Sequence, residues 1–300
     1  MNQNHLYVII LAGGGGTRFA PISTEARPKQ FLSIITSDKT MLEATYLRAL
    51  HLVDSQYIFI STHRDYKSLV LEQIPSLNEK NIITEPIRKN TAPAIAYISY
   101  FIYCSDPKAV LLFMPSDQYI HDLKLALQIF KEAANFVSEN NILLTFGVSP
   151  TYASTEYGYI HREKEIRKNI YDVKEFKEKP DEKTAKAYLD SGLYSWNAGI
   201  FCWQANFFLK EIAYYAPQIQ EALSVFTLRQ FSEDNLKFFF NLSPSISIDY
   251  ALMEKSKKVS MFSFNVGWSD VGTWDGLKKL QKTYQLNLPP QIEDYLKLHG

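Results

Sequence analysis

The sequence predicts an α/β fold in which a mainly parallel, mixed β-sheet is flanked by helices. Short runs dense in Ile, Val, Leu and Phe recur through the first half of the chain, and such runs are typical of strands buried on both faces. Helical patterns with capping residues lie between these runs. This alternation predicts right-handed crossovers between parallel strands. The 300 residues are 46% hydrophobic, which is enough for a large core.

Five apolar runs in the first half are the expected strands. They span residues 7–12, 57–61, 81–84, 109–114 and 142–148. The first intervening helix is expected to begin with a capping box, because Thr40 is followed three residues later by Glu43. Thr91 and Asp122 are the expected N-caps of two later helices.

In the second half the expected strands are isolated and are separated by helices and loops. They span residues 157–160, 172–178, 196–201 and 259–264. A helix is expected over 181–191 because Gly192 supplies a stop signal, a second over 273–281, and a short last one after the Pro289-Pro290 pair. No repeat or Pro/Gly/Ser-rich linker divides the chain, so we expect the two halves to share one sheet.

The composition argues against nucleic acid and membranes as binding partners and favours a reducing compartment. Lys plus Arg and Asp plus Glu both number 32, so no global basic field would draw the chain to nucleic acid or to an anionic membrane. Cys104 and Cys202 form no CxxC pair or Cys/His cluster, which argues against a thiolate zinc site or a disulfide scaffold and favours the cytoplasm.

The N-terminal apolar run lacks a basic segment before it and is better explained as a strand than as a signal peptide. We expect no membrane segment, since the longest later run, 94–104, is well below the ~20 residues that span a bilayer.

A glycine-rich loop immediately follows the first expected strand. Its sequence is LAGGGGTRFAPIS, beginning at Leu11. Residues Gly13 to Gly16 lack Cβ atoms, so consecutive backbone N–H groups can approach phosphate oxygens closely. Two familiar phosphate motifs do not fit, because no Gly-Lys-Ser/Thr follows and Arg18 takes the last glycine position of a GxGxxG that begins at Gly13. A flexible turn is the alternative explanation for a glycine run by itself.

Two cations near this loop favour phosphate binding over a simple turn. Arg18 lies just after Gly16, and Lys29 follows in RPKQF. Arg suits bidentate contact with a phosphate, whereas Lys acts as a point charge. As isolated residues both would be explained as solvated surface cations, but their place beside a glycine loop makes them candidates for neutralising a triphosphate.

At this point the sequence resembles the sugar-nucleotide pyrophosphorylases, and among them the mannose-1-phosphate guanylyltransferases. The glycine loop and PKQFL are similar to the signature loop of that family. Further similar blocks follow in the same order over residues 6–280: EPIRKNTAPAI from Glu85, FMPSDQYI from Phe113, TFGVSP from Thr145, FKEKPD from Phe176, WNAGIF from Trp196, SIDYALMEK from Ser247 and GWSDVGTW from Gly267.

This resemblance implies a Rossmann-like fold of the nucleotide-diphospho-sugar transferase type. It implies a nucleotidyltransferase domain over residues 1–282, divided near residue 150 into a nucleotide-binding half and a sugar-phosphate-binding half, and a short C-terminal tail over 283–300. The implied reaction transfers GMP from GTP to α-D-mannose 1-phosphate and gives GDP-mannose and pyrophosphate.

The chemistry of such a transfer agrees with the residues present. A sugar 1-phosphate oxygen is already ionised at neutral pH, so its attack on the α-phosphorus needs no general base and no histidine. It needs in-line positioning and cancellation of charge, which cations and Mg²⁺ supply. By resemblance, Arg18, Lys29 and Lys179 are the expected catalytic cations.

A pair of aspartates is the expected Mg²⁺ site. Asp117 follows the apolar run AVLLFMP, at the edge where open α/β sheets bind ligands, and Asp270 follows another expected strand in GWSDVGT. Two converging carboxylates suit Mg²⁺, which also takes phosphate oxygens and waters. Each aspartate alone is better explained by a turn or a cap, and the resemblance assigns both to the metal.

Residues of the second half are the candidates for the sugar phosphate. Lys179 would contact the phosphate, Glu178 and Asn197 the sugar hydroxyls, and Gly158 would bring a backbone amide close to the same ligand. A surface salt bridge between Glu178 and Lys179 and a strand bulge at Gly158 are the alternatives. By resemblance the sugar-phosphate site comprises Tyr157, Gly158, Glu178, Lys179, Asn197 and Gly199.

Glu85 is the candidate for guanine recognition, since one carboxylate can accept from N1–H and the 2-amino group together. Asn90 and Thr91 lie close enough in sequence to assist, although ordinary capping at a helix N-terminus explains Thr91 equally well. The expected nucleotide-binding residues are Leu11, Ala12, Gly13, Gly14, Gly15, Gly16, Thr17, Arg18, Lys29, Glu85, Asn90, Thr91, Ser116 and Asp117.

Four departures from the family leave alternatives open. Arg88-Lys89 stand where the family commonly has Gly-Arg, Ala20 where it often has Trp, Gln118 where it often has His, and ASTE precedes Tyr157 where PETG is usual. Another acceptor, a heptose, glucose or fucose 1-phosphate, is the first alternative, and a non-catalytic GDP-sugar-binding regulatory subunit is the second. The sequence is compatible with a homodimer. Because no isomerase domain follows, we expect no second activity.

Overall fold

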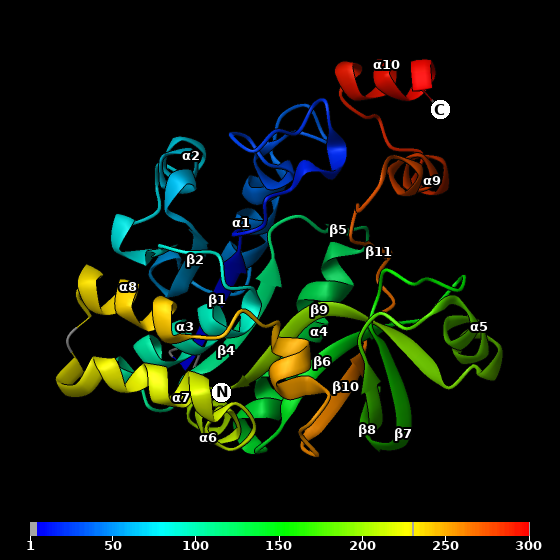
Figure 1. Cartoon of the computed structure of the whole chain (residues 1–300). Helices are drawn as coiled ribbons and strands as arrows, with labels where there is room; N and C mark the ends of the chain where they lie inside the picture. The colour runs from blue at the N-terminus through cyan, green and yellow to red at the C-terminus, as the bar shows by residue number, and fades with distance from the viewer. Residues whose placement is uncertain (1–4, 230, 300) are drawn as a thin grey trace. The chain divides into compact units, whose positions relative to one another are not determined.

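The structure, a computed structural model, describes residues 5–229 and 231–299 (Figure 1). The chain divides into two compact units, each built from several segments. Unit 1 consists of Met1–Tyr7, Glu85–Phe113 and Gln128–Asn265, and unit 2 consists of Val8–Thr84, Met114–Leu127 and Val266–Gly300. The division into two binding halves near residue 150 concerns ligands and stays a prediction.

Strands and helices are distributed along all of the described residues. The strands are β1 (Leu6–Leu11), β2 (Ile58–His63), β3 (Ile82–Glu85), β4 (Val110–Pro115), β5 (Tyr119–Ile120), β6 (Leu143–Val148), β7 (Tyr159–Arg167), β8 (Ile170–Lys177), β9 (Tyr194–Gln204), β10 (Val259–Ser263) and β11 (Trp268–Ser269). The helices are α1 (Met41–Leu50), α2 (Lys67–Gln73), α3 (Thr91–Ser105), α4 (Leu123–Glu139), α5 (Glu182–Ser191), α6 (Ala205–Tyr215), α7 (Pro217–Leu223), α8 (Glu233–Leu242), α9 (Trp274–Tyr284) and α10 (Pro290–His299). Each apolar run expected as a strand contributes to one.

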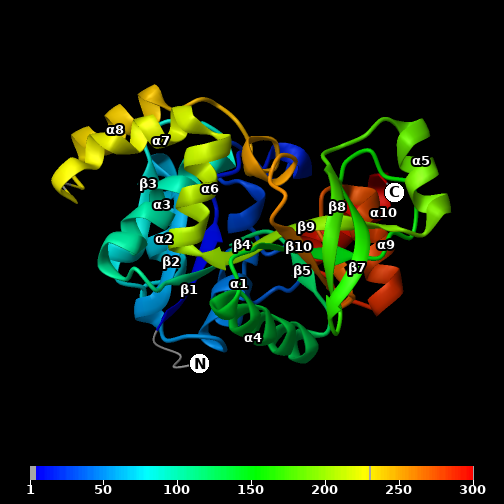
Figure 2. The same ribbon diagram turned by 90° about the horizontal axis from the view of Figure 1, so that it is seen from below.

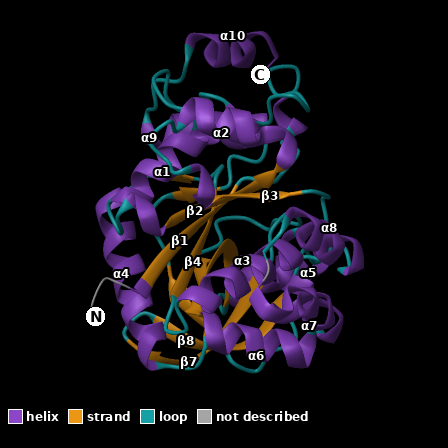
Figure 3. Cartoon of the chain, turned by 90° about the vertical axis from the view of Figure 1, so that its left-hand side faces the viewer, coloured by secondary structure: helices purple, strands orange, loops and turns teal. Residues whose placement is uncertain are grey.

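In unit 2 the strand order is β3-β2-β1, and β1 and β2 run parallel with Val8 opposite Ile58. Val8, Ile9 and Ile10 have no exposed surface, which is why this strand lacks an alternating pattern in the sequence. Helix α1 packs against β2 (Figure 3). A second, two-stranded sheet pairs β5 with β11 in antiparallel register. Strands of two residues have no detectable periodicity, and the sequence did not indicate this pair.

In unit 1 the strand order is β4-β9-β6-β10-β8-β7. Strand β9 runs antiparallel to both β4 and β6, whereas β6 and β10 are parallel. Strands β7 and β8 form a long antiparallel pair (Figure 2). The predicted Rossmann-like α/β fold with a mixed sheet flanked by helices is therefore confirmed.

Two predicted helix caps are confirmed. The Thr40 hydroxyl accepts from the Glu43 backbone N–H at 3.2 Å, and the Glu43 carboxylate accepts from the Thr40 N–H at 2.7 Å, which completes the capping box of α1. The Asp122 carboxylate accepts from the Leu125 N–H at 2.9 Å at the start of α4. Gly192, with a φ of 67°, ends α5 as expected.

The predicted N-cap at Thr91 is wrong by one residue. Helix α3 begins at Thr91, and its cap is Asn90, whose side-chain oxygen accepts from the Thr91 N–H at 2.8 Å. Asn90 has a φ of 66° and a ψ of −172°, a strained conformation outside the left-handed helical region, and its side chain still reaches the first N–H of the helix.

The segment expected as a C-terminal tail packs into the core of unit 2. Leu288 and Ile292 are buried in one cluster with Phe19, which follows the glycine loop. Phe19 meets Trp274 of α9 edge-on at 4.7 Å between ring centroids, and Trp274 stacks on Tyr295 of α10 at 4.1 Å (Figure 1 shows both helices). Burying a phenylalanine contributes about 1.5–3 kcal/mol, so this contact anchors the turn after the loop. Within the described ranges, no helix has the length and apolar character needed to cross a membrane.

Candidate functional site

The glycine loop follows β1 in unit 2 and is held through its carbonyl groups. The buried amide of Gln30 donates to the carbonyls of Ala12 at 3.0 Å and Gly14 at 2.8 Å. The Thr62 hydroxyl donates to the Ala12 carbonyl at 3.0 Å. Side-chain donors of the protein thus pair with two carbonyl groups of the loop. The sequence reasoning missed Gln30, although its place next to Lys29 in PKQF was a usable signal.

The glycines of this loop differ in what surrounds them. A Cβ added at Gly14 or Gly15 would meet no atom within 4 Å, so protein packing does not require glycine there. Gly16 has a φ of 50°, and a Cβ there would lie 2.6 Å from the Lys29 backbone nitrogen. Gly16 is therefore required by the fold, whereas Gly14 and Gly15 leave the backbone open to a ligand.

We expect Gly16→Ala to lower the free energy of unfolding by about 1–3 kcal/mol, because it combines left-handed strain with a clash. Gly15→Ala should leave stability within about 0.5 kcal/mol of the wild type. Urea unfolding followed by circular dichroism measures both variants. Equal destabilisation by the two would contradict the distinction drawn from the loop geometry.

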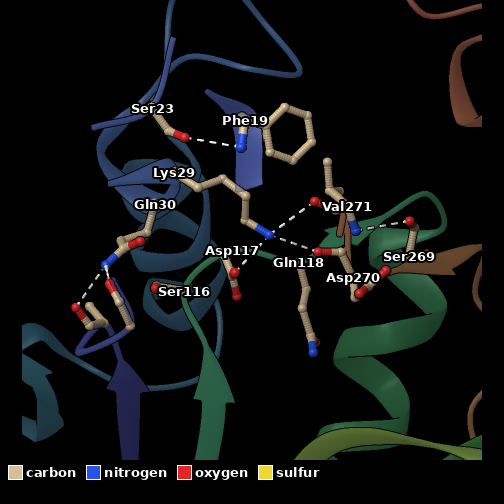
Figure 4. A network of polar contacts seen from close by, with 12 residues as sticks. Phe19, Ser23, Lys29, Gln30, Ser116, Asp117, Gln118, Ser269, Asp270 and Val271 are labelled. Carbon is tan, nitrogen blue, oxygen red and sulfur yellow. Dashed lines mark hydrogen bonds and ion pairs between the residues drawn. The ribbon is translucent and has the colours of Figure 1, made fainter. Parts of the chain in front are cut away.

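Lys29 connects the glycine loop with the two predicted metal ligands (Figure 4). Its side chain is buried, and its ammonium lies 2.7 Å from a carboxylate oxygen of Asp117. The same nitrogen donates to the backbone carbonyls of Asp270 at 2.9 Å and Val271 at 3.0 Å. An ammonium has three N–H groups, and these three acceptors use all of them. The structure thus brings together Lys29, Asp117 and Asp270.

The turn that carries Asp270 has an unusual backbone. Val271 is fully buried and has a φ of 48°, a conformation that costs a β-branched residue about 1–3 kcal/mol. Its N–H donates to the Ser269 hydroxyl at 3.1 Å, and its carbonyl accepts from Lys29 (Figure 4). The absence of a Cβ at Gly272 makes room for the Asp270 carboxylate. These contacts hold the Asp270 turn in place despite the strain.

Asp117 and Asp270 supply the carboxylate oxygens that a small divalent cation would use here. The Lys29 ammonium offsets the charge of the Asp117 carboxylate, whereas it contacts only the backbone carbonyl of Asp270 and leaves that carboxylate for another cation. Two carboxylates that leave room for phosphate oxygens and waters are a donor set that Mg²⁺ accepts. Among residues 5–229 and 231–299 the structure has no cluster of three or more His, Cys, Asp and Glu side chains suited to a metal.

Two other predicted phosphate ligands of unit 2 are Ser116 and Arg18. The Ser116 N–H donates to the Leu11 carbonyl at 3.0 Å, which places Asp117 beside the start of the glycine loop. Arg18 is exposed in a short turn, Thr17–Phe19, next to the buried Phe19 ring. Arg18 therefore reaches solvent, whereas Lys29 is enclosed by protein acceptors.

The predicted sugar-phosphate residues lie in unit 1, around Glu178. This side chain is 8% exposed, and its carboxylate forms an ion pair with the neighbouring Lys179 ammonium. A Cβ at Gly158 would lie 2.6 Å from a Glu178 carboxylate oxygen, so this glycine makes room for the carboxylate. The Glu178 N–H donates to the Glu254 carboxylate at 2.8 Å. Tyr157 lies at the same strand end, with its ring 5.0 Å from that of Trp196.

Asn197 is oriented by three hydrogen bonds. Its side-chain oxygen accepts from the Thr145 hydroxyl at 2.8 Å and the Gly199 N–H at 3.1 Å. Its amide nitrogen donates to the Asp249 carboxylate at 3.1 Å. Gly199 has a φ of 67°, which explains a glycine at this position. Asp249 was missed from the sequence, although an acid in the apolar stretch SIDYALM was a signal for it.

Burial raises the pKa of Asp249 to about 7, and the negative charge of Glu178 contributes to the same rise. Burial lowers the pKa of Lys179, but the hydrogen bond and charge of Glu178 outweigh it and the pKa of Lys179 is raised. Two carboxylates and one ammonium therefore share this cluster. Both Glu178 and Asp249 can accept hydrogen bonds from hydroxyl groups of a ligand.

We expect Asp249→Asn to change how stability depends on pH. The folded carboxyl titrates near pH 7 against an ordinary value of 3.8, so between those values the folded state holds a proton that the unfolded state has lost. The Asp249 contribution to stability therefore falls as pH rises from about 4 to 7 and is constant above. We therefore expect the difference in melting temperature, Asp249→Asn minus wild type, to increase as pH rises from about 4 to 7. Asp190→Asn, an exposed aspartate of the same unit, is the control; a flat difference for Asp249→Asn would exclude the raised pKa.

The candidate base-recognition residues lie in unit 1 as well. Glu85 is 8% exposed and ends β3. The Thr91 hydroxyl accepts from the Ile248 N–H at 2.9 Å, and Asn90 caps α3. The side chains of Asn90 and Thr91 thus hydrogen-bond to the nearby backbone. Glu85 is the only carboxylate among the three candidate residues.

Comparison with known proteins identifies similar families and structures. Residues 7–286 match the family model described as nucleotidyl transferase. A mannose-1-phosphate guanylyltransferase of Salmonella muenchen is 38% identical over an alignment of 293 positions, which covers 93% of this chain and 60% of that protein. The chain thus spans about 60% of the length of that curated relative.

Two solved structures are also similar. A protein named mannose-1-phosphate geranyltransferase from Thermus thermophilus has a TM-score of 0.83 and 30% identity, over 92% of this chain and 79% of that chain. A protein named mannose-6-phosphate isomerase from Helicobacter pylori has a TM-score of 0.72 and 30% identity, over 88% of this chain and 99% of that chain. The resemblance found in the sequence is thereby confirmed.

Proposed function

Because this chain belongs to the nucleotidyl transferase family, we propose that it transfers GMP from GTP to α-D-mannose 1-phosphate and gives GDP-mannose and pyrophosphate. The observation that carries the proposal is the Lys29 ammonium, held between Asp117 and the Asp270 turn beside a glycine loop with an open backbone. The guanylyltransferase relative supports the choice of mannose and guanine.

Unit 2 is the proposed site of the triphosphate. The N–H groups of Gly14 and Gly15 would approach phosphate oxygens, with Arg18 reaching them from solvent. Asp117 and Asp270 would hold Mg²⁺, which would cancel charge on the phosphates when bound. Lys29 would set the position of both aspartates and exchange one of its protein acceptors for a phosphate oxygen.

Unit 1 is the proposed site of the acceptor and the base. Lys179 would contact the sugar phosphate, and Glu178, Asn197 and Asp249 would hold the sugar hydroxyls. Glu85 would accept from guanine. The acceptor oxygen attacks the α-phosphorus in line, the bond to pyrophosphate breaks, and no covalent enzyme intermediate forms. The free thiols of Cys104 and Cys202 agree with a cytoplasmic location.

A pyrophosphate-release assay tests the proposal. The full chain with Mg²⁺ is incubated with GTP, ATP, CTP or UTP and with the 1-phosphates of mannose, glucose, fucose or a heptose. We expect release with GTP and mannose 1-phosphate above every other pair. Release with another pair would reassign the substrates, and tight GDP-mannose binding without turnover would indicate a regulatory subunit.

The same preparation is assayed for interconversion of mannose 6-phosphate and fructose 6-phosphate, since one similar structure is named as an isomerase. Isomerisation without pyrophosphate release would overturn the proposal. Light scattering tests the expected homodimer, which stays a prediction.

A further inference from the structure

A cavity of about 210 Å³ lies in unit 2, between helix α1 and strand β5. Its apolar wall includes Ile35, Met41 and Leu123, and its polar wall includes Arg48 and Gln118. It lies apart from the Lys29 nitrogen contacts described above, since neither Asp117 nor the glycine loop lines it. Sites for drug-sized ligands usually measure about 300–1,000 Å³, so an occupant of this cavity is small.

Arg48 places a positive charge in this cavity. The side chain is 8% exposed, and burial lowers the pKa of Arg48 to about 10, so the guanidinium is still charged at neutral pH. Its single hydrogen bond to the described residues is a long one, 3.4 Å, to the Gln118 carbonyl. Within the described part of the chain no carboxylate lies at ion-pair distance from it.

Other polar groups of the cavity wall have partners. The Thr40 hydroxyl donates to the Gln73 side chain at 2.8 Å, and Lys39 at the cavity forms an ion pair with Asp38. Arg48 is different, because five guanidinium N–H groups share one weak acceptor. Among the residues that the structure describes, no carboxylate balances the Arg48 charge, so an anion in the cavity would form charge-assisted hydrogen bonds with N–H groups that lack an acceptor there.

We propose that this cavity is a second ligand site, which binds a small organic oxyanion through the Arg48 guanidinium. A guanidinium forms paired, parallel hydrogen bonds with a carboxylate or a phosphate. The apolar wall formed by Ile35, Met41 and Leu123 accommodates a short carbon skeleton attached to that oxyanion. The ligand is therefore an organic phosphate or carboxylate rather than a bare ion.

The position of the cavity connects it with the aspartates described above. Gln118 directly follows Asp117, and its side-chain oxygen accepts from the Trp268 indole N–H at 2.9 Å. In the β5–β11 pair, Tyr119 lies opposite Ser269, the residue before Asp270. An occupant would thus contact β5, which begins two residues after Asp117 and pairs with the strand that precedes Asp270. The inference that it alters turnover rests on the proposed function, whereas binding to Arg48 does not.

Heat unfolding of the full chain tests binding independently of activity. Wild type, Arg48→Met and the control Arg27→Met, an exposed arginine of the same unit, are titrated with glycerol 3-phosphate, inorganic phosphate, butyrate or acetate against chloride of equal ionic strength. Phosphate bound at the glycine loop would shift all three proteins alike. The measured quantity is the rise in melting temperature of wild type and of Arg27→Met, minus the rise in melting temperature of Arg48→Met.

We expect one organic oxyanion to raise the melting temperature of wild type and Arg27→Met by about 2–4 °C more than that of Arg48→Met at about ten times its Kd. The stronger of glycerol 3-phosphate and butyrate identifies the source of the oxyanion. In chloride alone, Arg48→Met should melt no lower than wild type, because the methionine removes an uncompensated charge. Equal oxyanion shifts in all three proteins would overturn the proposal, as would a response to inorganic phosphate alone.

A second measurement applies if Arg48→Met does not fold. In wild type labelled with ¹⁵N-arginine, the Arg48 Nε signal is assigned by its loss in Arg48→Lys. The oxyanion found in the titration must shift that signal and saturate, and an unmoved signal would exclude Arg48 as the ligand. Pyrophosphate release is measured in a separate experiment. If no substrate pair reacts, the proposed function fails, but the binding of an oxyanion to Arg48 is still tested.

Discussion

Asp117→Asn and Asp270→Asn are each expected to lower turnover by about 10²-fold or more. Asparagine keeps the shape of the side chain but removes the negative charge that would attract Mg²⁺. The two variants differ in their contact with Lys29, which touches the Asp117 carboxylate but only the backbone carbonyl of Asp270. Asp270→Asn should therefore leave that network intact, and any loss of activity reports on its carboxylate.

Initial rates over a range of Mg²⁺ concentrations measure this effect. If each carboxylate binds the ion, the half-saturating Mg²⁺ concentration rises in both variants as turnover falls. Asp65→Asn, an exposed aspartate of the same unit, is the matched control and should retain wild-type rates. Near-normal turnover of either Asp117→Asn or Asp270→Asn would remove that residue from the metal site.

Lys29→Met is expected to impair both activity and stability. The substitution leaves the Asp117 carboxylate without its ammonium and two carbonyls without a donor. Leaving buried acceptors unpaired costs about 1–3 kcal/mol, and the value here lies toward the lower end because the Asp117 side chain is 37% exposed. Turnover should fall by about 10²-fold or more, since the position of both aspartates depends on this lysine.

A double-mutant cycle separates the pair from its surroundings. Lys29→Met should destabilise less in the Asp117→Asn background than in wild type, with a coupling of about 0.5–3 kcal/mol. Lys29→Arg keeps the charge, but a planar guanidinium cannot meet three acceptors arranged around one ammonium, so it should restore stability only in part. Additive effects of Lys29→Met and Asp117→Asn would show that the contact contributes nothing.

The fold was predictable where local sequence controls it. The apolar runs became β1, β2 and β4 because strands buried on both faces need continuous apolar residues, and the Thr40–Glu43 box began α1 because its contacts are local. Strands β5 and β11 were not predictable, since two residues carry no period and their pairing joins distant parts of the chain. The cap at Asn90 was missed because it depends on a strained, positive-φ backbone rather than on residue type alone.

The candidate site was predictable as a set of residues but not as a network. Glycine spacing and the flanking cations indicated a phosphate loop, whereas the burial of Lys29 depends on carbonyls more than 200 residues away in the chain. Gln30 and Asp249 were missed because each acts through a partner that no local pattern shows, the loop carbonyls for Gln30 and Asn197 for Asp249. Residue type predicts the available chemistry, and tertiary contacts decide which groups remain for a ligand.

Each of the two compact units consists of three separate segments of the chain, so neither unit can be produced by a single cut. The chain passes from one unit to the other at residues 7/8, 84/85, 113/114, 127/128 and 265/266. No single truncation therefore isolates the unit that holds the glycine loop, Lys29 and both aspartates, and limited proteolysis at one junction would leave each fragment incomplete. A split version would have to reassociate from pieces, so its two halves should regain structure only when mixed.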